Sequence, residues 1–116
     1  MKIKKIKLTI KDVTWTAQLV PSNIYDLTYG PDSNGITELH TKTISFNVKV
    51  FSESLVRHEL FHAYVSSCCV GSMTSMQHAD MEELCAEIFE FHGAEILKKS
   101  KHLFKILNKY KNEVKS

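Results

Sequence analysis

The spacing of apolar residues changes once along this chain. Apolar and polar residues alternate in three stretches of the first fifty residues, namely 6–10, 13–19 and 44–50. After Ser52 the apolar residues recur four, seven and eight positions apart. Alternation is typical of β-strands, and the second spacing is typical of amphipathic helices. The chain is therefore predicted to have an α+β fold, with a small antiparallel sheet packed on a pair of helices and a basic amphipathic helix at the C-terminus.

The strands are expected to pair in two groups. Residues 6–19 are interpreted as a β-hairpin. The segment 21–35 contains both prolines and two of the four glycines, so it is interpreted as mostly loop, with a short helical turn around residues 24–27. A strand of residues 44–50 is expected to pair with one formed by residues 36–40.

Three helices are expected after the strands. Ser52 is a good N-cap, and the apolar stripe that follows it predicts the first helix. Asp80 can cap a second helix, from residue 81 to about residue 94, which Gly93 can interrupt or end. From Glu95 onward, apolar residues at helical spacing predict a third helix whose outer face carries most of the C-terminal lysines.

The length and apolar content suit one compact domain. The 116 residues, 43% of them hydrophobic, can bury a core, so residues 1–116 are expected to form a single domain. No apolar run approaches the roughly 20 residues that cross a bilayer, and the lysine-rich start lacks the apolar core of a secretory signal. We therefore expect a cytoplasmic protein with no membrane partner, whose three cysteines stay reduced.

Charge is divided unevenly along the chain. Residues 1–11 carry five lysines and no acid, residues 12–97 three bases and twelve acids, and residues 98–116 seven lysines and one acid. Basic ends can attract nucleic acid. They lack the interleaving of aromatic and basic residues that single-strand binders use, and solvated lysines on an edge strand and a helix face are the simpler interpretation. Nucleic acid is therefore not the expected partner.

One short motif points to chemistry. His58-Glu59-Leu60-Phe61-His62 matches H-E-x-x-H on the first predicted helix. Residues four apart share a helix face, so both histidines can direct ring nitrogens at one point while Glu59 approaches it from the side. Two imidazoles can hold a zinc ion, and a carboxylate beside them can accept a proton from water. The motif therefore predicts a zinc hydrolase site.

The second predicted helix carries candidates for a third metal ligand. Glu83 is preferred because Glu87 lies one turn further along the same face, where it can accept a hydrogen bond from a ligand histidine. Glu82 points about 100° away and has no carboxylate one turn later. The simpler alternative is that Asp80 and Glu83 form a capping box on a solvated helix face.

The residue that stabilises negative charge on a substrate carbonyl cannot be identified from spacing. His78, in the predicted loop before the second helix, can reach the site, as can His40 or Tyr29 from the preceding segment. Each of these residues is more commonly an exposed or packing residue.

Two runs of the sequence together resemble a known family. They are TISFNVKVFSESLVRHELFHAYV (residues 43–65) and DMEELCAEIFEFHG (residues 80–93). The arrangement is similar to that of minimal zincin-like metallopeptidases of phages and mobile elements, akin to the ImmA/IrrE family. In that family a strand precedes the H-E-x-x-H helix, and a glutamate of the next helix completes the metal site.

The resemblance implies a zincin-like helix pair and a role for each matched residue. His58 and His62 would be ligands of Zn²⁺, Glu83 the third ligand, and Glu59 the general base. The implied activity is zinc-dependent hydrolysis of a peptide bond in a peptide or protein substrate, in the cytoplasm of a host cell if the protein is encoded by a phage.

Two other functions compete with the peptidase. One is a binding module of the same fold, with a structural metal or none, by which a phage or mobile element engages a host protein. The other is a nucleic-acid-associated protein that uses the lysines at both ends. For the peptidase, an extended substrate is expected to pair with the strand of residues 44–50, if that strand is an exposed edge.

Overall fold

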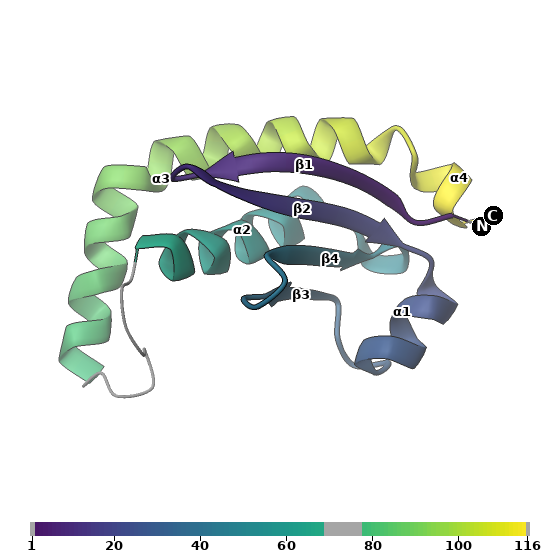
Figure 1. Ribbon diagram of the computed structural model, residues 1–116, viewed down its shortest axis with the longest axis horizontal. Helices are drawn as coiled ribbons and strands as arrows, with labels where there is room; N and C mark the ends of the chain where they lie inside the picture. The colour runs from purple at the N-terminus through teal and green to yellow at the C-terminus, as the bar shows by residue number, and fades with distance from the viewer. Residues whose placement is uncertain (1, 69–77, 116) are drawn as a thin grey trace.

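Strands occupy the first half of the chain and helices the second, with one short helix between strands (Figure 1). The computed structural model describes residues 2–68 and 78–115, apart from the side chains of residues 68 and 78–80. The elements are β1 (Lys4–Ile10), β2 (Val13–Val20), α1 (Ser22–Tyr29), β3 (Gly35–Glu38), β4 (Thr43–Asn47), the 3-10 helix η1 (Val48–Val50), α2 (Glu53–Cys68), α3 (His78–Asn108) and α4 (Lys111–Lys115). The predicted α+β fold is thereby confirmed, and so is the short helix between the strands.

The four strands form one sheet in the order β1, β2, β4, β3. β1 and β2 form an antiparallel hairpin, in which Leu8 lies opposite Trp15. β3 and β4 form a second antiparallel pair, in which Thr37 lies opposite Ile44. β2 and β4 run parallel, with Ala17 beside Ile44. Both predicted pairs are confirmed, but the sheet is mixed rather than wholly antiparallel.

The parallel pairing follows from the route of the chain between β2 and β4. After β2 the chain passes through α1 and β3, and the β3–β4 hairpin then returns it in the direction of β2. β4 thus lies between β2 and β3, and residues 48–50 form η1 instead of extending the strand. The condition for a substrate to pair with residues 44–50, an exposed edge, is therefore not met, because β3 is the outermost strand on this side.

The helices depart from the sequence prediction at one place. The predicted cap of α2 is confirmed, since the Leu55 backbone N–H donates to Ser52 Oγ at 3.1 Å. The second and third predicted helices are one helix, α3, which continues through Gly93 and contains Asp80 within its first turn. A single glycine costs about 1 kcal/mol in a helix, which good helix formers on both sides can offset. Figure 1 shows that α3 changes direction along its length. Within residues 2–68 and 78–115, no helix combines the length and hydropathy needed to cross a bilayer.

One hydrophobic cluster joins the sheet to α2, α3 and α4. Alternate residues of β2 point into it, and Trp15, Ala17 and Leu19 are fully buried. The stripe predicted for α2 supplies Val56, Leu60, Ala63 and Tyr64, all fully buried. Because this stripe faces the core, the histidines on other faces of α2 are directed away from it.

The basic ends of the chain lie together in the fold. β1 runs alongside the C-terminal half of α3 (Figure 1), and a small hollow of about 160 Å³ between them is lined by Lys7, Lys99 and His102 among others. Lys99 Nζ donates to the backbone oxygen of Thr9, and Lys4 Nζ lies 4.0 Å from the centre of the Tyr110 ring. Several lysines thus make contacts within the fold.

Candidate functional site

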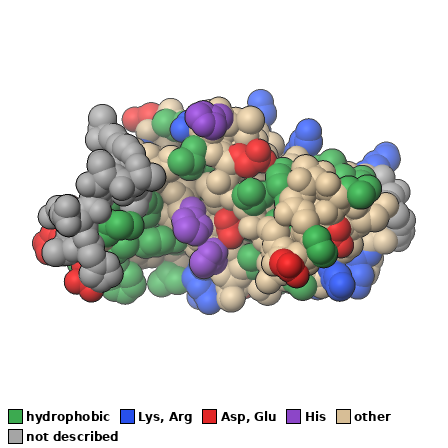
Figure 2. Space-filling view, turned by 90° about the horizontal axis from the view of Figure 1, so that it is seen from below, with side chains coloured by type: hydrophobic (Ala, Val, Ile, Leu, Met, Phe, Trp, Pro, Cys, Tyr) green, Lys and Arg blue, Asp and Glu red, His purple; other side chains and the backbone are tan. Residues whose placement is uncertain are grey.

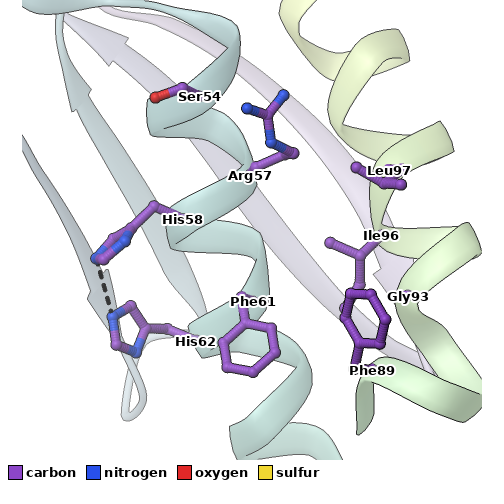
Figure 3. A pocket seen from close by; sticks show the side chains of 9 residues that line it. All are labelled: Ser54, Arg57, His58, Phe61, His62, Phe89, Gly93, Ile96 and Leu97. Carbon is purple, nitrogen blue, oxygen red and sulfur yellow. Dashed lines mark hydrogen bonds between the residues drawn. The ribbon is translucent and has the colours of Figure 1, made fainter. Parts of the chain in front are cut away.

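The two histidines of the motif lie one helical turn apart on α2 with their rings turned toward one another (Figure 3). The Nε2 atoms of His58 and His62 are 3.3 Å apart, and the ring planes meet at 77°. The His58 side chain is 67% exposed. Two nitrogens that each lie about 2.0–2.1 Å from a tetrahedral zinc ion are about 3.3–3.4 Å from one another. The donor pair therefore fits two adjacent ligand positions of zinc.

The carboxylate between them in sequence is buried against the sheet. Glu59 is only 5% exposed. Its Oε1 accepts a hydrogen bond of 2.8 Å from the Thr37 hydroxyl on β3, and its Oε2 lies 3.9 Å from His58 Nε2. A buried carboxylate is expensive without a hydrogen-bond partner. Glu59 is thus held beside a candidate ligand nitrogen by contacts to a strand.

A glycine allows β3 to approach α2 closely at this point. A Cβ atom added to Gly35 would lie 3.1 Å from Glu59 Cγ, 3.1 Å from Leu55 Cδ1 and 3.3 Å from Glu59 Oε2. Each of these separations is tighter than ordinary van der Waals contact. The absence of a side chain at Gly35 therefore leaves the space that the Glu59 carboxylate occupies.

Two hollows of different chemistry meet at His58. An apolar groove of about 620 Å³ lies between α2 and α3, and Phe61, Phe89 and Ile96 contribute to its walls (Figure 3). A polar recess of about 510 Å³ lies between residues 32–35 and the start of α2, and it includes Glu59. Figure 2 shows histidine, acidic and hydrophobic side chains together near the middle of this face.

Glu83 does not form a metal-binding group with the histidine pair. The part of the chain that the structure describes contains no group of three His, Cys, Asp or Glu side chains that could hold a metal ion. Phe89 and Gly93 of α3 lie across the groove from the histidines (Figure 3). Glu83 is exposed and lies six residues before Phe89, about 9 Å along the helix axis. Its role as third ligand stays a prediction.

The rotation of α3 distinguishes Glu83 from its neighbour Glu82. Seven residues of a helix take about two turns, so Glu82 lies on the same side of α3 as the groove-lining Phe89. Glu83 is turned about 100° from that side, and Glu87 is turned further still. Of the three glutamates, Glu82 therefore has the rotation that suits a donor directed toward the groove.

The remaining candidates lie in different surroundings. Tyr29 is held by a 2.7 Å hydrogen bond from its hydroxyl to Glu38 Oε1. His40 is exposed in the turn between β3 and β4. His78 is the first residue of α3 rather than part of a loop, and its side chain lies outside the described residues.

A buried tyrosine lies next to the polar recess. Tyr25 is fully buried, and its hydroxyl lies 2.7 Å from Ser33 Oγ, which lines the recess. Burial raises the pKa of Tyr25; the Ser33 hydrogen bond acts against this shift, and the charge of Glu59 adds to it. The neutral hydroxyl is therefore the form that the folded protein favours.

Sequence reasoning missed Thr37, Gly35 and the groove wall of α3. Thr37 meets Glu59 only because β3 is the edge strand beside α2, and that placement depends on the parallel pairing of β2 with β4. Gly35 and Thr37 are two positions apart, so the two residues lie on the same face of a strand. Nothing local marks either residue as part of a site.

Comparisons of the chain with protein-family models, with curated proteins and with solved structures found no match.

Proposed function

We propose that the protein is a zinc-dependent peptidase. The observation that carries this proposal is the 3.3 Å separation of His58 Nε2 and His62 Nε2 next to the buried Glu59 carboxylate. His58 and His62 would hold the metal, and a third donor would come from the acidic first half of α3. When bound, zinc supplies a Lewis acid and makes water a nucleophile near neutral pH.

Glu59 is assigned the proton transfer. Its Oε2 is 3.9 Å from His58 Nε2, so it lies beside the position that a metal on the histidine pair would take. In hydrolysis it would accept a proton from the attacking water and deliver it to the leaving amine. The Thr37 hydroxyl donates a hydrogen bond to the other carboxylate oxygen, Oε1. Oε2 is therefore available for this transfer.

The outer edge of β3 supports a peptide as the substrate. β3 pairs with β4 on one side and, within residues 2–68 and 78–115, with no strand on the other. An extended peptide can add to such an edge through main-chain hydrogen bonds and needs no particular sequence to do so. It would then lie next to α2, with the groove and the recess available to its side chains.

Cleavage by the zinc-loaded wild type and by Glu59→Gln tests this function. Both would be incubated with a peptide library made from a cell lysate, because a selective peptidase can ignore generic substrates. Glu59→Gln keeps the side-chain shape and an oxygen for the Thr37 hydroxyl to bind, so it should retain zinc and its melting temperature. Cleavage should fall by about 10²-fold or more, since general-base catalysis contributes about that much. Equal cleavage by both proteins would point to a contaminant or to another base.

A second candidate function is a binding module. Phe89 and Leu97 line the apolar groove and are 74% and 48% exposed, and Phe91, elsewhere on α3, is 72% exposed. Exposed aromatic residues beside an apolar groove are typical of protein contact sites. If the zinc-loaded wild type cleaves nothing in the library, and both wild type and Glu59→Gln capture the same partner protein, the binding module replaces the peptidase.

A further inference from the structure

The Glu59 carboxylate is held by the edge strand and not by its own helix. Thr37 Oγ1 lies 2.8 Å from Glu59 Oε1 and 3.1 Å from the Glu59 backbone oxygen. A hydroxyl has one hydrogen to donate, and the shorter contact to a carboxylate is the stronger of the two. Within residues 2–68 and 78–115, Thr37 is the donor that the structure provides for this carboxylate.

Gly35 leaves space for the same carboxylate. Gly35 and Thr37 are two residues apart on β3 and so face the same way, toward α2. A Cβ added at Gly35 would lie 3.1 Å from Glu59 Cγ and 3.3 Å from Oε2. One carboxylate oxygen is thus fixed by a hydrogen bond, and glycine at position 35 leaves room for the other.

We propose that Thr37 is a positioning residue for the Glu59 base. This inference rests on the proposed peptidase function. The Thr37 hydroxyl holds Oε1 against β3, so that Oε2 is turned toward the histidine pair, 3.9 Å from His58 Nε2. Without the hydroxyl, the carboxylate can rotate about its side-chain bonds, and misplacement of a catalytic group by about 1 Å can reduce a rate about 10²-fold.

Thr37→Val and Thr37→Ser test the proposal. Valine keeps the branched shape but has no hydroxyl, whereas serine keeps the hydroxyl. Thr37→Val should lower kcat about 10- to 100-fold, as expected for loss of a hydrogen bond to a charged group, with KM and zinc content per chain unchanged. Thr37→Ser should restore most of kcat. Thr14→Val, the same change at an exposed position of β2, should leave kcat unchanged.

A second variant keeps the test decisive if Thr37→Val does not fold. Thr37→Ala also removes the hydroxyl and has a smaller side chain, so it should lower kcat as Thr37→Val does while zinc is retained. Thermal unfolding of each variant identifies any that are unfolded. Wild-type kcat in folded Thr37→Val, or in folded Thr37→Ala if Thr37→Val is unfolded, would overturn the positioning role.

The two possible failures can be told apart. A zinc-loaded wild type that cleaves nothing in the peptide library overturns the peptidase function, and the role of Thr37 falls with it. An active wild type whose kcat is unaffected by Thr37→Val overturns the role of Thr37 alone. A Thr37→Val variant that loses zinc together with kcat would assign Thr37 to the structure of the metal site and would likewise overturn the proposal.

Discussion

His58 Nε2 and His62 Nε2 lie 3.3 Å apart on the exposed side of α2. The helix brings the two side chains together, because residues four apart are neighbours on one face. The opposite, fully buried stripe of α2 fixes which way that face points. In the proposed zinc site, two ligand positions would come from this one helix, and a third protein donor would come from another element.

Glutamine variants on α3 locate the third donor. The helical rotation of α3 places Glu82 on the side that lines the groove. Glu82→Gln is therefore expected to weaken zinc retention more than Glu83→Gln. Glu87→Gln is expected to have the smallest effect, since Glu87 is turned furthest from that side. Zinc retained after dialysis against a weak chelator measures the order.

The reverse order would support the sequence-based assignment. Suppose that Glu83→Gln loses the most zinc and that Glu87→Gln lowers the zinc affinity about 10- to 100-fold. Glu83 would then be the ligand, and Glu87 would be a hydrogen-bond partner of a ligand histidine. The start of α3 would then have to adopt a different rotation when metal is bound.

Tyr25 should make the folded protein sensitive to alkaline pH. Burial, partly opposed by the Ser33 hydrogen bond, raises its folded-state pKa above the ordinary 10.0. The unfolded chain therefore loses this proton first, so the stabilisation is fully present below pH 10.0 and is lost as pH rises through the folded-state value.

Tyr25→Phe provides the comparison. The variant lacks the titrating hydroxyl, so its free energy of unfolding should fall less steeply than that of the wild type between about pH 9 and pH 11. Denaturant unfolding across this range measures both slopes. Equal slopes would show that Tyr25 does not carry the alkaline sensitivity.

Nucleic acid is expected not to bind, although both lysine-rich ends lie together. Lys4 lies over the Tyr110 ring, and Lys99 contacts Glu95 and the Thr9 backbone oxygen. These contacts compete with phosphate for two of the lysines. We expect no detectable binding of single- or double-stranded DNA or RNA at about 50 mM salt, a condition that favours phosphate contacts. Saturable binding that weakens steeply with added salt would contradict this and favour the nucleic-acid function.

Local patterns were sufficient for the β1–β2 hairpin, the α2 cap and the placing of both histidines on one helix face. The alternation of apolar and polar residues predicted β1 and β2. The start of α2 was predicted from Ser52, a polar residue followed by an apolar stripe. Each of these depends on neighbours in sequence. The parallel pairing of β2 with β4 was missed, because it depends on the route through α1 and β3 and not on any residue pattern within β4.

The rest of the site could not be predicted for the same reason. Thr37 contacts Glu59 across 22 positions of sequence, through a strand order that the residues of β3 do not encode locally. Gly93 suggested a break, but α3 continues through it. The choice of Glu83 over Glu82 was made without knowing which side of the helix lines the groove, and that side is the one that carries Phe89.

Zinc content tests the central claim most directly. Protein purified without chelator should contain about one zinc per chain by elemental analysis. His58→Ala and His62→Ala should reduce this to traces, while His102→Ala, a change at an exposed histidine elsewhere on α3, should not. A wild type that holds only traces and takes up none when zinc is added would contradict the account, and so would His58→Ala and His62→Ala variants that keep a full zinc.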